Sequence, residues 1–123
     1  MSLSKIYALR DHILMPTVQG RKLVRLYYAI NEHFYASLNS DVFLKALDMA
    51  DDAGKVVDRL NNENYSGIVF IQNFINEVRE LMDSSMENSK SAEYKKDIDL
   101  LIQKMSEYKD LNRQQFMAKL NED

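Results

Sequence analysis

The amino-acid sequence predicts an all-α protein: an up-down antiparallel bundle of four main helices, preceded by a short N-terminal helix. Only three Gly and one Pro occur in 123 residues, whereas chains with many β-turns use more of both. Apolar residues recur at steps of three and four, the spacing of one helical face. The polar breaks between them are short, which favours antiparallel neighbours. We therefore expect residues 1–123 to form a single helical domain, with helices at about 4–15, 18–38, 41–60, 66–87 and 91–120.

The first two helices are separated by Pro16. Ser4 can cap the first helix, and Pro16 ends it because proline lacks the amide that a continuing helix would use. The second helix begins after Thr17, which can cap it, or is delayed by Gly20 to Arg21. Gly20 can also adopt a backbone conformation closed to other residues, so we expect a sharp reversal here. The apolar stripe of the second helix consists of Leu23, Tyr27, Ile30, Phe34 and Leu38.

The third and fourth helices are bounded by Asn-rich breaks. Asn39 to Asp41 supply capping side chains for the third helix. The run from Asn61 to Asn64 reads as a loop, after which Tyr65 or Ser66 opens the fourth helix. The apolar segment 68–71 also has the composition of a short strand, but no second strand is predicted to pair with it. We therefore assign this segment to the fourth helix.

The fifth helix is the longest in the prediction. Its core spacing would extend it to about 42 Å over 91–120, which is longer than a small bundle. Either its end frays or a partner covers the overhang, and a homodimer is the simplest way to bury an exposed seam. The residues expected to form this interaction face are Tyr94, Ile98, Leu101, Met105 and Tyr108.

Composition narrows the range of partners and sites. The net charge of −3 disfavours nucleic acid as a partner. The chain has no cysteine, which removes disulfides, thiolate metal sites and thiol nucleophiles. No apolar run is long enough for a membrane span, and no signal-peptide pattern opens the sequence. The expected compartment is the cytoplasm if the chain is complete, whereas a fragment of a longer protein could be exported.

The charge of the chain is distributed unevenly along it. Residues 1–30 carry five basic side chains and one acidic side chain, and residues 31–88 carry eleven acidic and four basic ones. Such a polarity can orient an interaction, although solvated helix faces also account for charge patterns of this kind.

Several groups of polar residues are candidates for a metal site or for acid-base catalysis. His12 and His33 have no further ligand at metal spacing, and the chain lacks the Glu-x-x-His pairs of a di-metal bundle. The cluster Asp48, Asp51 and Asp52 offers oxygen ligands that suit Ca²⁺ or Mg²⁺, but Lys55 follows at salt-bridge spacing. Paired carboxylates could also perform acid-base work, as in Glu77, Glu80 and Asp83. We predict no cofactor, no metal and no catalytic residue from these patterns.

The pair Tyr27-Tyr28 lies beside Arg21, Lys22 and Arg25. This mixture can contact phosphate or single-stranded nucleic acid. Adjacent helical residues lie ~100° apart, so we expect one tyrosine to point into the core and the other to lie at a helix boundary.

Within residues 9–38, an Arg-Asp pair, a Pro turn, Gly-Arg, Leu-Val and Tyr-Tyr follow in order, with the key positions Arg10, Asp11, Leu14, Gly20, Arg21, Leu23, Val24, Tyr27 and Tyr28. This segment resembles the helical part of the bacterial CFI-box C-terminal domain, in which the same motifs follow a Cys-containing box. The Cys-containing box that names this family is absent. The resemblance implies a tail region of a bacterial protein, often an exported one, and implies no activity.

We expect a non-enzymatic interaction or accessory domain of a bacterial protein, which presents a helix face to a protein partner or to its own copy. The alternative is a small-molecule-binding or catalytic bundle. Its pocket would lie between the second, third and fourth helices, lined by Tyr28, Tyr35 and the Asp48 cluster.

Overall fold

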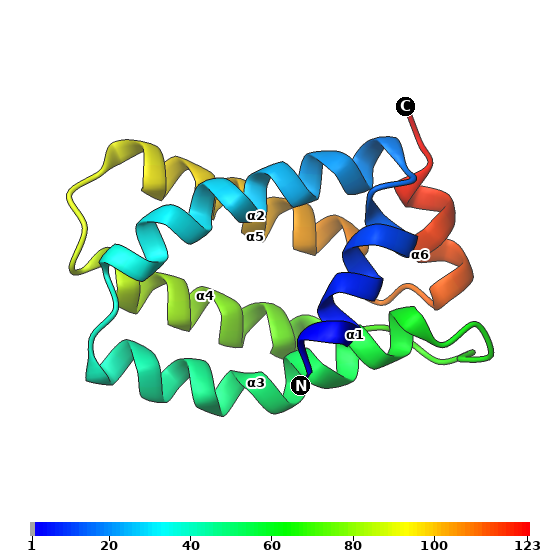
Figure 1. Cartoon of the computed structure of the whole chain (residues 1–123), viewed down its shortest axis with the longest axis horizontal. Helices are drawn as coiled ribbons and strands as arrows, with labels where there is room; N and C mark the ends of the chain where they lie inside the picture. The colour runs from blue at the N-terminus through cyan, green and yellow to red at the C-terminus, as the bar shows by residue number, and fades with distance from the viewer. Residues whose placement is uncertain (1) are drawn as a thin grey trace.

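The computed structural model describes residues 2–123, and helices make up most of this range (Figure 1). The elements are α1 (Leu3–Ala8), the π-helical turn η1 (Leu9–Leu14), α2 (Val18–Ala36), α3 (Ser40–Asn61), α4 (Gln72–Met86), α5 (Ala92–Tyr108) and α6 (Arg113–Leu120). No strand occurs among the described residues. The all-α prediction is confirmed.

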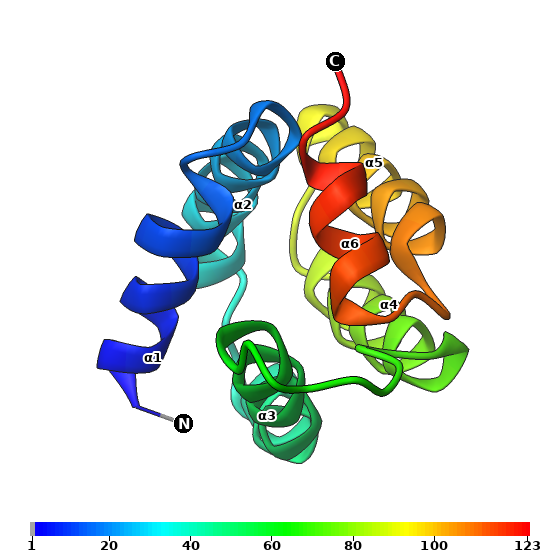
Figure 2. The ribbon, with the colours of Figure 1, turned by 90° about the vertical axis from the view of Figure 1, so that its right-hand side faces the viewer.

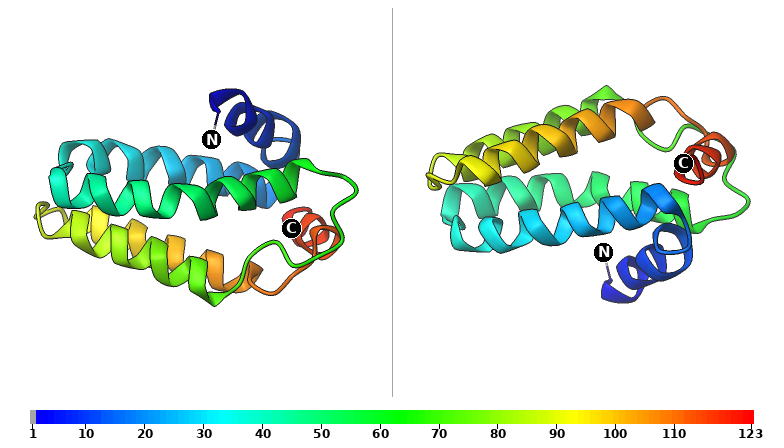
Figure 3. Two further views of the ribbon diagram at one scale, coloured as in Figure 1. Left: turned by 90° about the horizontal axis from the view of Figure 1, so that it is seen from below. Right: turned by 90° about the horizontal axis from the view of Figure 1, so that it is seen from above.

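The four long helices form two layers, α2 with α3 and α4 with α5 (Figure 3). α3 packs on α4 and α2 packs on α5, and α4 also packs closely on α5. Successive long helices run in opposite directions (Figure 1). Viewed along the helices, α1 lies outside the α2–α3 layer, and α6 crosses one end of the molecule (Figure 2).

The first reversal forms where the sequence places it, but Gly20 acts differently from the expectation. η1 ends at Leu14, and the Thr17 hydroxyl accepts a hydrogen bond from the Gly20 amide at 3.0 Å, which caps α2. No glycine among the described residues has a positive φ. A Cβ at position 20 would instead overlap the carbonyl oxygen of Leu14. Gly20 is therefore explained by the close approach of η1 to the start of α2.

The fourth helix begins at Gln72, so the predicted start at residue 66 is wrong. The preceding residues are extended, and Ile68 forms an antiparallel β-bridge with Asn112. The amide of Val69 donates to the carbonyl of Leu111 at 2.9 Å, and the Val69 carbonyl accepts from Arg59. This extended path buries Val69 and Phe70 in the core. The bridge pairs residues 44 positions apart, which a local sequence pattern does not reveal.

The predicted fifth helix 91–120 is two helices, and the prediction of one long rod is wrong. α5 ends at Tyr108, and Asp110 takes a left-handed conformation with φ of 63°. Asn112 then starts α6 with a reciprocal capping box to Gln115. The break turns α6 back over the end of the bundle, where Phe116 and Leu120 are buried.

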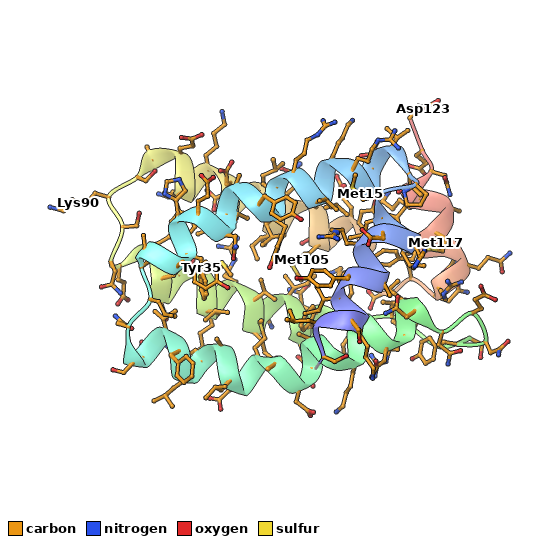
Figure 4. The ribbon with its side chains drawn as sticks, in the orientation of Figure 1. Met15, Tyr35, Lys90, Met105, Met117 and Asp123 are labelled. Atoms are coloured by element: carbon orange, nitrogen blue, oxygen red, sulfur yellow. The ribbon has the colours of Figure 1, made fainter. Side chains whose placement is uncertain are left out.

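The predicted interaction face on 94–108 lies inside the protein. Tyr94 and Ile98 are fully buried and Tyr108 nearly so. Leu101 and Met105 are partly buried against the same core cluster, and Met105 lies in the middle of the molecule in Figure 4. The expectation that these residues form an exposed seam is corrected, because the break before α6 removes the overhang that needed a partner.

The helices α2 and α3 make few contacts with each other although they are consecutive. η1 touches both and places Ile13 in the core at one end. At the other end each helix is tied to the opposite layer: Asn88 donates to the Ser37 carbonyl at the end of α2, and Lys45 of α3 donates to the Ser84 hydroxyl at 2.6 Å. The two helices of the α2–α3 layer are therefore held apart from each other.

Candidate functional site

Large exposed apolar side chains gather on α1, α2 and the first half of α3. Among the described residues, thirteen large hydrophobic side chains are exposed, and most of them belong to this region. Those of α1 and α2 are Leu3, Tyr7, Tyr27, Tyr28, Tyr35 and Leu38 (the last in the turn after α2), and those of α3 are Phe43, Leu44 and Leu47. So many exposed large apolar side chains within one region are unusual on a monomeric protein.

Four tyrosines form the centre of this region, and we call Tyr7, Tyr27, Tyr28 and Tyr35 the tyrosine cluster. Each is between 48% and 66% exposed. The rings of Tyr27 and Tyr28 meet edge to face with centroids 5.6 Å apart. Partial desolvation raises the pKa of the Tyr27 hydroxyl, and the neighbouring hydroxyls of Tyr35, Tyr28 and Tyr7 raise it further. Tyr27 is thus close to the other three.

Arg10 joins α1 and η1 to the tyrosine cluster. Its guanidinium carbon lies 4.8 Å from the centroid of the Tyr7 ring, and its Nη1 donates to the Tyr28 hydroxyl at 3.2 Å. It also pairs with both carboxylate oxygens of Asp11, at 2.8 and 3.3 Å. The hydrogen bonds to Asp11 and Tyr28 raise the pKa of the guanidinium, and Arg10 in turn lowers the pKa of Asp11. Arg10 therefore holds a fixed charge among aromatic rings.

The expectation that one of Tyr27 and Tyr28 points into the core is wrong. Both rings are about half exposed, and the core positions on this part of α2 are taken by Leu26 and Ile30. The predicted apolar stripe of this helix includes Leu23, Tyr27 and Ile30. Because α2 buries the side that carries Leu26, the stripe is rotated, and both tyrosines lie on the flank toward α1.

The open face is the part of this region that α1 does not cover, and we define it by Tyr35 and Leu38 with Phe43 and Leu47 of α3. Tyr35 lies on the side of α2 that turns toward α3 and α4 in Figure 4. Phe43 and Leu47 are four residues apart, so they share one flank of α3, and both are at least half exposed. Leu44 is rotated away by one position and lies on another side of the helix.

The histidines and acidic groups considered from the sequence do not assemble into a metal site. No group of three His, Cys, Asp or Glu able to hold an ion occurs among residues 2–123. His33 packs against the buried Tyr94 ring, with centroids 5.2 Å apart, whereas His12 is exposed on η1. Lys55 lies 3.5 Å from Asp51 and 3.8 Å from Asp52. The lysine offsets the repulsion that the acidic cluster would otherwise have.

Glu77 has the most unusual environment among the acidic residues. It lies on α4 facing α3, in a crease of about 190 Å³ lined by Lys45, Asp48 and Glu80 together with Met49 and Leu81. Its Oε2 is buried with no donor. Desolvation raises the pKa of Glu77, and the neighbouring carboxylates of Asp52 and Glu80 raise it further. The buried oxygen without a donor and the two acidic neighbours both disfavour the charged form of Glu77.

The alternative pocket between the second, third and fourth helices is not assembled. Asp48 lines the crease toward α4, whereas Tyr28 is bonded to Arg10 on the α1 side. A more apolar crease of about 380 Å³ lies between α2 and α5 instead. Leu23, Leu26 and Leu100 contribute to its floor. Its polar side chains are Gln19, Lys22, Arg25, Asp97 and Lys104.

No protein-family model, curated protein or solved structure matches the chain. Within residues 2–123, no helix combines the length and apolar character needed to cross a membrane. The geometry of the exposed region is therefore the main guide to function. Sequence periodicity predicts the apolar stripe of α2, but it does not show that Tyr27, Phe43 and Leu47 stay exposed, because that depends on tertiary packing.

Proposed function

We propose that this chain is a non-enzymatic helical interaction domain of a bacterial protein, which presents the tyrosine cluster and the open face to a protein. The observation that carries the proposal is the concentration of half-exposed aromatic and aliphatic side chains on α1, α2 and the first half of α3. An exposed apolar region of this extent favours association, because its burial removes apolar surface from water.

The residue types in this region also suit protein recognition. Tyrosine and arginine are enriched among the residues that dominate binding energy in interfaces. A tyrosine supplies a large contact area with few rotatable bonds. Arg10 is held by Asp11 and Tyr28, so little of its conformational freedom remains to be lost on binding.

Two further inferences complete this proposal. The alternating direction of α2 to α5 and their short connections support an up-down antiparallel bundle as the fold class. The resemblance of residues 9–38 to the CFI-box domain supports a bacterial accessory region, because Arg10, Gly20 and Tyr28 join η1 to α2. The proposed role is non-enzymatic because it assigns the function to exposed aromatic and aliphatic side chains, which supply contact area to a partner.

Site-specific photocrosslinking in the producing cell tests the proposed function. A benzophenone amino acid replaces Tyr35 or Leu47, and the matched control carries it at Gln103, an exposed position on α5. We expect adducts to one protein species from positions 35 and 47, competed by an excess of unmodified chain, and none from position 103. Equal labelling from all three positions, or none from the face, would contradict the proposal.

A second candidate function is binding of a small anionic amphiphile in the α2–α5 crease. It is favoured by the apolar floor and by three basic side chains against one acidic side chain. Titration of isotope-labelled protein with laurate tests it. We expect saturable shifts of the Leu100 and Ala29 amides, which Leu100→Glu abolishes. Shifts spread evenly over the protein would count against this candidate.

A further inference from the structure

We propose that the α2–α5 crease binds a medium-length alkyl carboxylate in one orientation, with the carboxylate between Lys22 and Lys104 and the chain running toward Ala29. This inference rests on the second candidate function and adds the orientation and the length of the ligand. It is carried by three properties of the crease: the register of its two helices, its apolar floor and the distribution of charge along it.

The register of α2 against α5 follows from one aromatic contact. The rings of His33 and Tyr94 have their centroids 5.2 Å apart, and α2 packs on α5 as an antiparallel neighbour (Figure 1). Both helices rise by about 1.5 Å per residue, so each step toward the start of α2 is matched by a step toward the end of α5. This matching places Lys22 beside Lys104 and Met105.

The crease therefore has two ends that differ in their side chains. Lys22 and Lys104 lie at the end near the start of α2, and by the same matching Ala29 and Asp97 lie at the other end. Ala29 follows Lys22 by seven positions, which corresponds to about 10 Å along the helix. A carboxylate held at the first end would leave room for an extended chain of about that length.

The floor between these ends is apolar and open to solvent. Leu23, Leu26 and Leu100 contribute to it. Within residues 2–123, Leu100 is the single large hydrophobic side chain that is exposed on α4, α5 or α6. The closely packed layer thus leaves one large apolar side chain uncovered, and that side chain lines the crease. The crease volume of about 380 Å³ also lies within the range of ~300 to 1,000 Å³ that is typical of small-molecule sites.

The charge along the crease selects the end that an anion occupies. Lys22 and Arg25 are exposed, and neither forms an ion pair within residues 2–123. Lys104 lies 3.6 Å from Glu107, but a largely exposed pair of this kind is weak. Asp97 is the single acidic side chain of the lining and belongs to the opposite end. An anion is therefore attracted to the first end and repelled from the second.

The reverse orientation is disfavoured by the same observations. It would place the carboxylate beside Asp97, where the two like charges repel each other. It would also place the end of the alkyl chain between the ammonium groups of Lys22 and Lys104, which would lose contact with water and gain no partner. The register and the charge therefore favour one direction of the chain.

The first test measures the affinity of the protein for a series of carboxylates from hexanoate to laurate by calorimetry. We expect the affinity to rise by about three- to fourfold for each added methylene up to decanoate, and then to level off because the chain has reached the Asp97 end. Decylamine has the same chain with the opposite charge and should bind at least about tenfold more weakly than decanoate. A rise that continues unchanged to laurate would overturn the proposed length.

The second test removes the charges that hold the carboxylate. Lys22→Gln and Lys104→Gln should each weaken decanoate binding by about two- to fivefold, whereas Asp97→Asn should not weaken it. Lys95→Gln is the matched control, because it removes the same charge from a position on α5 that does not line the crease. Circular dichroism checks that each variant stays folded. Equal losses from all three lysine variants would show that only the overall charge matters, and would overturn the orientation.

The third test observes the orientation directly. A decanoate that carries a nitroxide at the end of its chain is added to isotope-labelled protein, and the broadening of each amide signal is measured. We expect the amides of Ala29 and Asp97 to broaden more than those of Lys22 and Lys104. The opposite order would establish the reverse orientation.

The outcomes separate this inference from the second candidate function. If decanoate binds with saturation but the nitroxide broadens the Lys22 end most, the candidate function stands and the orientation is wrong. If no carboxylate of the series binds with saturation, both fail. Leu47→Glu changes the open face and should leave decanoate binding unchanged. A loss of binding in that variant would place the ligand on the open face and overturn the inference.

Discussion

The two layers of this protein differ in how closely their helices pack and in whether their aromatic side chains are buried. In the α4–α5 layer the helices pack on each other, and Tyr94 is fully buried with its hydroxyl 2.6 Å from that of Ser85. In the α2–α3 layer the helices are spread, and the tyrosines of α2 are about half exposed or more. Both layers carry aromatic residues at helical spacing. The difference shows that periodicity defines a helix face, whereas tertiary packing decides whether that face is covered.

The strongest test of this comparison is a large-to-small substitution on each layer. Ile98→Ala, at a fully buried site, should lower the free energy of unfolding by about 2 to 5 kcal/mol, because it leaves a cavity. Leu47→Ala, at a half-exposed site, should change it by less than about 0.5 kcal/mol in the monomer. Denaturant unfolding at a concentration low enough to prevent association measures both. Similar losses for the two variants would refute the distinction between the layers.

The variant Gly20→Ala tests the close contact between η1 and the start of α2. The added methyl group would meet the backbone of Leu14 as well as the Thr17 hydroxyl, and backbone atoms cannot rotate away. We expect a loss of about 1 to 3 kcal/mol in unfolding free energy, typical of overpacking. The companion variant Ala29→Gly, inside α2, should lose only about 1 kcal/mol through helix propensity. Thermal unfolding followed by circular dichroism compares them, and a Gly20→Ala protein of unchanged stability would show that η1 is not tightly packed.

Removing single tyrosine hydroxyls gives a smaller difference between the layers. Tyr94→Phe deletes a buried hydrogen bond to Ser85, which also donates to the Met82 carbonyl at 2.6 Å. The expected loss is about 1 kcal/mol. Tyr35→Phe removes an exposed hydroxyl that has no hydrogen-bond partner among residues 2–123, and it should be neutral within error. Chemical denaturation resolves the two, and a neutral Tyr94→Phe would indicate that the buried hydroxyl pair contributes nothing net.

The smallest effect on stability is expected at Glu77, whose carboxyl lies in the crease between α3 and α4. Its pKa is raised above the ordinary value of 4.5 by desolvation, Asp52 and Glu80. The folded state therefore binds this proton more tightly than the unfolded state. The resulting stabilisation is complete below the unfolded pKa and is lost as the pH rises through the folded pKa.

Glu77→Gln should therefore stabilise the protein increasingly between about pH 4 and pH 7, by on the order of 0.5 kcal/mol at the upper limit. Glu107→Gln on α5 is the control, and unfolding curves at several pH values give the comparison. A difference that shrinks with rising pH would have the wrong sign and would disprove the assignment.

Local sequence signals account for much of the fold. Pro16, Thr17 and Asn39 mark helix ends that the structure also has, and the apolar stripes belong to helices that form. The break at Asp110 also had a local signal, since Asn112 and Gln115 have capping-box spacing. The four-three spacing of apolar residues continues through this signal and predicts one unbroken helix instead.

The remaining features depend on contacts between distant residues. The extended path of Val69 and Phe70 requires Leu111 as a hydrogen-bond partner, which no local pattern reveals. Which apolar side chains remain exposed is likewise a property of tertiary packing. The spacing of Tyr94 and Ile98 fits one face of a helix, and so does that of Tyr28 and Tyr35. Only the packing of the layers shows that the first pair is buried and the second pair is exposed.

The β-bridge between Ile68 and Asn112 has a consequence for the order of folding. It joins the two ends of the α4–α5 hairpin, so that residues 68–112 form a closed loop with paired backbone at its base. The amides of Val69 and Asp110 lie outside any helix, yet each is bonded across this base. In hydrogen exchange we expect both to be released together with the centres of α4 and α5, as one cooperative unit. The spread pair α2 and α3 should open first, leaving that hairpin as the last part of the molecule to unfold.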